Sequence, residues 1–134
     1  MSKIIKKISC IDIGSNAIKY RQYRLLKNDS IELDTFKRIP LRLGADAFSL
    51  GKMSDKTYED FKWTLKKLKK HAMKKNSELL GIFATSAMRT FSNQSQILKK
   101  IKKDLNLKID ILSGREEASL LRYFEYKELS LIHI

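Results

Sequence analysis

The first constraint on this chain is a short apolar run, residues 8–13, that a single carboxylate interrupts. The run predicts a buried strand, in which Asp12 is costly unless it meets a cation or hydrogen-bond donors. Gly14, Ser15 and Asn16 follow as a small polar turn, where a glycine lets backbone N–H groups approach a ligand closely. This combination is typical of a loop that binds phosphate and metal. The alternative is an ordinary hairpin whose Asp caps its own turn.

Length and composition restrict the class of protein. A chain of 134 residues is one domain or one lobe of a larger protein. Its net charge of +13 is typical of proteins that meet polyanions, although most lysines on helix faces are simply solvated. The one cysteine, Cys10, fits a reducing compartment and has apolar neighbours, so we expect it in the core rather than as a reactive thiol. We see no signal peptide, membrane-spanning stretch or zinc-ligand spacing and expect a cytoplasmic protein with no membrane partner.

Periodicity predicts an α/β lobe with the element order β-β-β-α-β-α-β-α. The expected strands are residues 4–12, 18–26, 31–40, 79–84 and 109–112, and residues 45–52 read as a loop. Ser54 should cap an amphipathic helix that ends near residues 75–76, and Ser92 or Asn93 should cap the next helix. Ser113 and Glu116 have capping-box spacing and should open a third helix. That helix is expected to bury Leu120, Leu121 and Phe124.

Three polar clusters fall at strand ends in this order. A meander followed by βα units predicts a mixed five-stranded sheet with helices on its faces, and ligands of such sheets bind beyond the carboxyl ends of the strands. The clusters are residues 12–16, 85–89 and 113–117. The first two supply backbone N–H groups, the hydroxyls of Ser15, Thr85 and Ser86, and the guanidinium of Arg89, all of which suit phosphate. The third supplies Glu117 at a helix start.

These clusters lie in three motifs that resemble the exopolyphosphatase and guanosine pentaphosphate phosphatase (Ppx/GppA) family. The motifs are Ile-Asp-Ile-Gly-Ser-Asn at 11–16, Ala-Thr-Ser-Ala-Met-Arg at 84–89 followed by Asn93, and Ile-Leu-Ser-Gly-Arg-Glu-Glu-Ala at 111–118. Residues 41–44 also fit. The resemblance extends to about Lys127 and implies the actin-like, ribonuclease H-like ATPase fold, with two lobes around a cleft. This chain would be the N-terminal lobe.

The resemblance also implies roles for individual residues. Asp12 would help to hold Mg²⁺ or its waters, and Glu117 would be the base that activates or orients the attacking water. The implied phosphate-binding residues are Gly14, Ser15, Asn16 and Arg89. Such chemistry needs a cation to offset charge, donors to hold phosphates and a carboxylate to align water. Ala17 and Tyr20 depart from the family pattern, which leaves the substrate preference open.

The implied activity is removal of the terminal phosphate from inorganic polyphosphate or guanosine pentaphosphate, and a homodimer of a full-length version is a further hypothesis. Two other functions stay open: a non-enzymatic polyanion-binding module, and the N-terminal half of an actin-like sugar or acetate kinase. Nucleic acid is not favoured as a partner, because the sequence shows neither an aromatic-rich single-strand platform nor a helix-turn-helix signature.

The family's second phosphate loop and second lobe are not found in the sequence, so we expect no phosphate release from this chain alone. Its last six residues match one reading frame of a transposon-end adapter used in DNA sequencing. We therefore expect a lobe of residues 1–128 and a non-native tail at 129–134. A natural apolar strand leading to the missing loop is the alternative.

Overall fold

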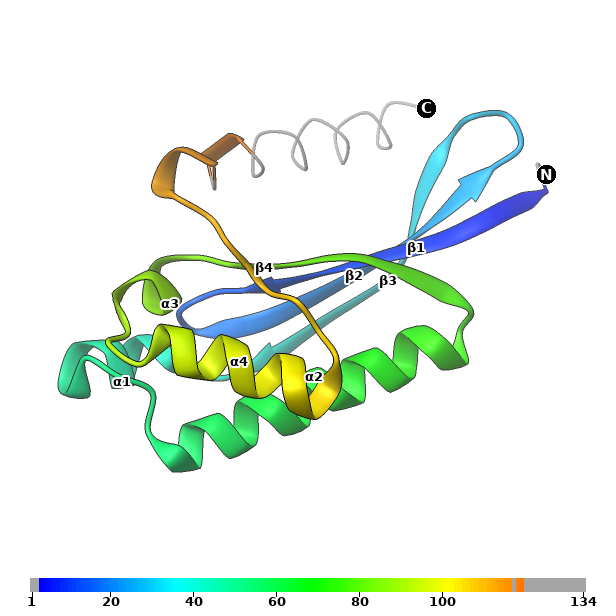
Figure 1. Ribbon diagram of the computed structural model, residues 1–134. Helices are drawn as coiled ribbons and strands as arrows, with labels where there is room; N and C mark the ends of the chain where they lie inside the picture. Colours follow the sequence, from blue (N-terminus) through cyan, green and yellow to red (C-terminus); the bar gives the residue numbers. More distant parts are fainter. Residues whose placement is uncertain (1–2, 117, 120–134) are drawn as a thin grey trace.

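Figure 1 shows the computed structural model of the chain, which describes residues 3–116, 118 and 119. Several predictions lie outside the described residues. They concern Glu117, the helix face of Leu120, Leu121 and Phe124, and the tail at 129–134.

The structure is built on one mixed sheet, as expected. Its strands are β1 (Ile4–Ile13), β2 (Ala17–Leu26), β3 (Ile31–Pro40), β4 (Ser77–Ala84) and β5 (Asp110–Ile111). They lie in the order β3-β2-β1-β4-β5. The first three form an antiparallel meander, whereas β4 is parallel to β1 and β5 is parallel to β4. The carboxyl ends of β1, β4 and β5 therefore meet at one edge of the sheet.

Among the residues that the structure describes, four helices connect these strands. They are α1 (Leu43–Leu50), α2 (Asp55–Lys74), α3 (Ser86–Thr90) and α4 (Gln94–Leu105). Ser54 caps α2 as predicted, since its hydroxyl accepts from the Thr57 N–H at 3.2 Å. The predicted capping box is also present: the Glu116 N–H donates to Ser113 Oγ at 3.1 Å, and the Ser113 N–H donates to Glu116 Oε1 at 3.2 Å.

Two short helices were not predicted. The expected loop at 45–52 is wrong for most of its length, because α1 occupies Leu43–Leu50. This helix buries only Leu43 completely, and Gly44 lowers its helix propensity, so the periodic signal is weak. Gly51 ends α1 in the left-handed conformation with φ of 65°. α3 has five residues, too few to show a 3.6-residue period.

Asn93 stands at the N-cap position of α4, but its side chain does not cap the helix. Instead its amide pairs with the backbone of Met53, donating to the Met53 carbonyl at 2.9 Å and accepting from the Met53 N–H at 3.0 Å. The adjacent Ser92 N–H donates to the Gly51 carbonyl at 2.8 Å. The predicted N-cap position of Asn93 is therefore confirmed, but its side chain makes no capping hydrogen bond. Asn93 joins two loops that are far apart in the sequence.

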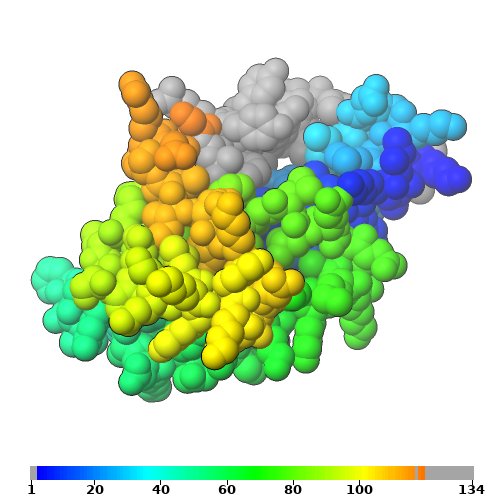
Figure 2. Space-filling model, in the orientation of Figure 1, coloured from blue at the N-terminus to red at the C-terminus, as the bar shows by residue number. Residues whose placement is uncertain are grey.

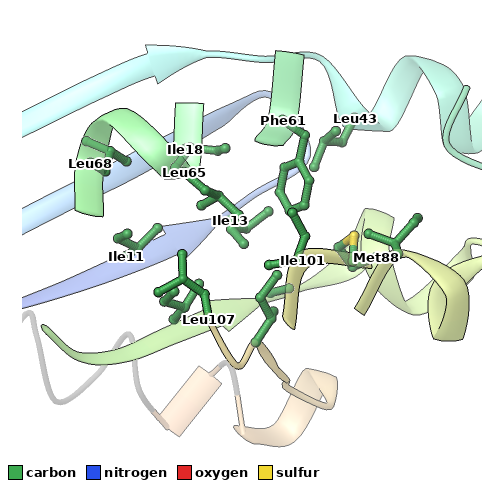
Figure 3. Packing of buried hydrophobic residues seen from close by; sticks show 14 of the residues in the cluster. Ile11, Ile13, Ile18, Leu43, Phe61, Leu65, Leu68, Met88, Ile101 and Leu107 are labelled. Atoms are coloured by element: carbon green, nitrogen blue, oxygen red, sulfur yellow. The ribbon is translucent and has the colours of Figure 1, made fainter. Parts of the chain in front are cut away.

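One face of the sheet packs against α2 and α4, which lie on the same side of it (Figures 1 and 3). Buried residues recur at every second position in β1 and at every third or fourth position in α2, as the two backbone geometries require. The fully buried set includes Ile11, Ile13, Ile18, Phe61, Leu65, Leu68, Met88 and Ile101. Burying each such side chain stabilises the fold by about 1.5–3 kcal/mol relative to exposure, so this layer holds the strand ends in position.

Tyr20, one of the departures from the family pattern, points into this core. It is fully buried opposite Ile11 in the strand register, and its hydroxyl donates to Gln22 Oε1 at 2.7 Å. Gln22 Nε2 in turn donates to Asp34 Oδ2 at 2.6 Å. Because Asp12 adjoins Ile11 on the strand, the side chains of Tyr20 and Asp12 lie on opposite faces of the sheet.

The outer surfaces of α2 and α4 adjoin one another in the space-filling view (Figure 2). Their exposed lysines include Lys66, Lys67, Lys70, Lys74, Lys99 and Lys103. Among the residues that the structure describes, no helix has the length and apolar character needed to cross a bilayer.

Candidate functional site

Backbone hydrogen bonds bring the three polar clusters to one edge of the sheet. The Thr85 N–H donates to the Ile13 carbonyl at 3.1 Å, which ties the end of β4 to the end of β1. The Leu112 N–H donates to the Ala84 carbonyl at 2.9 Å and ties the chain after β5 to β4. The three polar clusters therefore start from adjacent strand ends, as the predicted strand order implied. They are residues 12–16, 85–89 and 113–116.

Gly14 makes room in the turn between β1 and β2. Its N–H donates to the Ala17 carbonyl at 3.0 Å, and a Cβ at this position would lie 3.2 Å from that oxygen. A side chain would thus crowd the turn. Since the Gly14 N–H is used inside the hairpin, the donors available to a ligand come from the next two residues.

Ser15 and Asn16 are held by the segment that leads into α1. The Ser15 carbonyl accepts from the Gly44 N–H at 2.8 Å, and the Asn16 carbonyl accepts from the Leu41 N–H at 3.0 Å. In a trans peptide the C=O and the following N–H point in opposite directions, so the Asn16 N–H points away from α1. Neither the Ser15 nor the Asn16 N–H donates a hydrogen bond within the part of the chain that the structure describes.

The hydroxyls of Ser15 and Ser86 are hydrogen-bonded to each other at 2.6 Å. Ser15 belongs to the first cluster and Ser86, which is exposed, to the second. A pair of hydroxyls can donate one further hydrogen bond to an anion. Thr85 is different: its side chain is buried and its hydroxyl donates to the Ile13 carbonyl at 3.3 Å. The hydroxyl of Thr85 therefore supports the strand ends.

Arg89 connects the second cluster to the third. Its Nη1 donates to the Leu112 carbonyl at 2.7 Å, one residue before Ser113. A guanidinium carries five N–H donors in a planar fork, so this contact uses one of them and orients the others. Arg89 lies half-buried at the same edge as Ser15 and Ser86.

Asp12 lies on the sheet face opposite the apolar core. In the strand register it stands across from Lys19 on β2 and Phe83 on β4. Directly opposed residues lie on the same face of a sheet, so Lys19 shares the face of Asp12. Its ammonium group can offset the cost of partly burying the Asp12 carboxylate. Within the described residues, no three His, Cys, Asp or Glu side chains gather as a metal-binding group. Mg²⁺ is commonly held by one or two carboxylates together with substrate phosphates, and Asp12 fits that limited role.

Cys10 lies on the same sheet face as Asp12 and is partly buried. Burial raises the pKa of its thiol to about 11; Arg21 opposes the shift and Asp12 adds to it. The thiol therefore stays protonated at neutral pH and is a poor nucleophile, as expected. The expected core position is wrong, because Cys10 lies on the sheet face opposite the apolar core and is only partly buried.

Sequence reasoning missed the residues that support the turn from outside. Gly44 and Leu41 contribute only backbone groups, so their side chains carry no signal of that role. The glycine at the end of the 41–44 segment was the one sequence signal for this support, because a glycine often marks a place where two backbones approach closely.

Comparison with solved structures identifies the fold. The Ppx/GppA family member of Aquifex aeolicus superposes with a TM-score of 0.76 at 21% identity, over 81% of this chain and 35% of that one. An exopolyphosphatase from Cytophaga hutchinsonii gives a TM-score of 0.78 at 22% identity, over 86% and 36%. The chain is therefore an α/β lobe of the actin-like ATPase fold.

Sequence comparison then gives the family. The model of the Ppx/GppA phosphatase family matches residues 31–124, and the chain belongs to that family. Exopolyphosphatase 1 of Mycobacterium leprae is 23% identical over 114 residues, and that of Mycobacterium tuberculosis is 24% identical over 114 residues. These matches cover 85% of this chain but only 34% and 33% of the two relatives. The chain thus spans about a third of the length of the curated relatives it matches.

Proposed function

We propose that this chain is the N-terminal lobe of a phosphohydrolase that removes the terminal phosphate of inorganic polyphosphate or guanosine pentaphosphate. The observation that carries the proposal is the convergence of Ser15, Asn16, Ser86 and Arg89 at one sheet edge, with the Ser15–Ser86 hydroxyl pair at 2.6 Å. Relatives named exopolyphosphatase favour polyphosphate as the substrate.

The first step is capture of the phosphate chain. The donors are the N–H groups of Ser15 and Asn16, the one hydrogen that the pair of serine hydroxyls can still donate, and the Arg89 guanidinium, which together suit an anion with many acceptor oxygens. Arg89 can hold two oxygens of one phosphate, because its fork matches that geometry. Gly14 serves this step by leaving the turn uncrowded.

The second step is hydrolysis. Asp12 would hold Mg²⁺ or its waters together with phosphate oxygens, and the bound ion would offset charge on the phosphates. Glu117 would orient or activate the attacking water. The opposing lobe would grip the phosphate and metal from the other side, so we expect this chain alone to bind polyphosphate weakly, in a salt-sensitive way, without releasing phosphate.

The proposal can be tested with a full-length version, in which this chain is continued by a second lobe with a glycine-rich phosphate loop. We expect that version to release phosphate from polyphosphate with Mg²⁺, and Glu117→Gln to lower turnover by about 100-fold or more with nearly unchanged substrate binding. A Glu117→Gln variant that loses stability but keeps its turnover would show that the carboxylate only stabilises a helix start. No phosphate release, with transfer of phosphate from ATP to a sugar or acetate, would favour the kinase alternative.

The chain alone gives a second test. Phosphate release above the no-enzyme control, abolished by Glu117→Gln, would show that one lobe suffices and would refute the expected inactivity. Binding of polyphosphate that is insensitive to Arg89→Ala would favour a non-enzymatic polyanion-binding module.

A further inference from the structure

Two elements outside the β1–β2 turn hold Ser15 from different sides. The Gly44 N–H, in the first turn of α1, donates to the Ser15 carbonyl at 2.8 Å. The Ser86 hydroxyl, at the start of α3, is hydrogen-bonded to the Ser15 hydroxyl at 2.6 Å. Since α1 and α3 also pack against each other, the two contacts belong to one support behind the turn.

Gly44 is required here for space. Its backbone does not have positive φ, so its conformation is open to other residues. A Cβ at this position, however, would lie 3.2 Å from the Ser15 Cβ and 3.3 Å from the Ser15 carbonyl oxygen. Both distances are shorter than ordinary van der Waals contact, so any side chain would push α1 and the turn apart.

These contacts determine what the turn can present to an anion. The Gly44 N–H turns the Ser15 carbonyl toward α1, and the trans peptide then directs the Asn16 N–H the opposite way. The hydrogen bond to the Ser86 hydroxyl holds the Ser15 side chain in place. A turn released from either contact could rotate its peptide and place carbonyl oxygens where the N–H donors had been.

We infer that Gly44 and Ser86 are positioning residues, which hold the donors of Ser15 and Asn16 in the orientation that binds phosphate. The inference rests on the proposed phosphate site and extends it to two residues outside the turn. It assigns a function to the glycine of the 41–44 segment, whose contribution is the absence of a side chain.

The test is a titration of the ¹⁵N-labelled 134-residue chain with tripolyphosphate, followed by NMR at the amide signals of Ser15 and Asn16. We expect Gly44→Ala and Ser86→Ala each to weaken binding by about threefold to tenfold, the effect of losing roughly one hydrogen bond. Ser86→Thr should recover most of the affinity, because it keeps the hydroxyl. Ser49→Ala is the matched control, since Ser49 is an exposed serine on α1 and lies outside the three polar clusters.

A merely structural role has a different signature. Under that reading Gly44→Ala and Ser86→Ala would lower the thermal midpoint, while the folded variants bound tripolyphosphate as tightly as the parent, and this result would overturn the inference. Equal affinity of Ser86→Thr and Ser86→Ala would overturn the part that concerns Ser86. If the parent chain shows no shift at Ser15 and Asn16, the proposed phosphate site itself fails, and the inference fails with it.

Discussion

Replacing Asn93 should reveal whether a residue in a family motif acts on the ligand or on the fold. In the structure its side-chain amide makes two hydrogen bonds, of 2.9 and 3.0 Å, with the backbone of Met53. Met53 is only 2% exposed, so water has little access to the groups that Asn93→Ala would leave without partners. The predicted effect is therefore a loss of stability.

The magnitude follows from those two contacts. Each hydrogen bond contributes about 0.5–1.5 kcal/mol, and an unsatisfied buried group costs about 1–3 kcal/mol, so Asn93→Ala should lower the free energy of unfolding by about 2–4 kcal/mol. For a domain of this size, 1 kcal/mol corresponds to roughly 3–5 °C in the thermal midpoint. We therefore expect the midpoint to fall by about 6–20 °C.

The assay is thermal unfolding followed by circular dichroism, with tripolyphosphate affinity measured below the transition. Gln96→Ala is the control, because Gln96 is an exposed amide on the same helix, and its truncation should change stability by less than about 0.5 kcal/mol. Asn93→Asp should be destabilised as well, since it keeps the acceptor for the Met53 N–H but sets an oxygen against the Met53 carbonyl. A midpoint within about 2 °C of the parent, together with lost affinity, would refute the structural role and make Asn93 a ligand residue.

Three further predictions concern stability, reactivity and binding. Cys10 should react with a maleimide at about pH 8 roughly 100-fold more slowly than in the urea-unfolded chain, because burial raises the pKa of its thiol from 9.0 to about 11. Equal rates would show that the thiol is accessible and has an unshifted pKa. Burial, followed by nearby lysines, lowers the pKa of His71 below 6.5, so its stabilising contribution is present above that pH and declines as the pH falls through it. His71→Phe should keep a ring against Tyr20 and reduce the difference between midpoints at about pH 7.5 and about pH 5.5, and an unchanged difference would assign it to other groups. Arg89→Ala should lower both the thermal midpoint and the affinity for tripolyphosphate. Arg89→Lys should restore the midpoint but only part of the affinity, because an ammonium group can reach the Leu112 carbonyl but cannot bind two phosphate oxygens as a guanidinium does. Full recovery of affinity in the lysine variant would exclude two-oxygen binding by Arg89.

The sequence alone was sufficient for most of the strands and for two local caps. β3 has the predicted bounds, β1 and β2 differ from prediction by one residue, and the Ser54 cap and the Ser113–Glu116 capping box are present. The burial patterns of strands and helices, the helix caps and the turns all depend on residues within about five positions of one another. A short stretch of sequence therefore contains the whole signal. The motifs also indicated that the polar clusters meet at one sheet edge, because strand direction follows from the element order.

Tertiary structure decided what those residues do once they meet. α1 forms where a loop was expected, and the Gly44 N–H at its start contacts a turn nearly thirty residues earlier in the chain. Thr85 and Asn93, both in a motif that suits phosphate, direct their side chains to the backbones of Ile13 and Met53. A side-chain hydroxyl or amide can form the same hydrogen bonds with a backbone group as with a ligand. The positions of its neighbours in the folded chain determine which of the two it contacts.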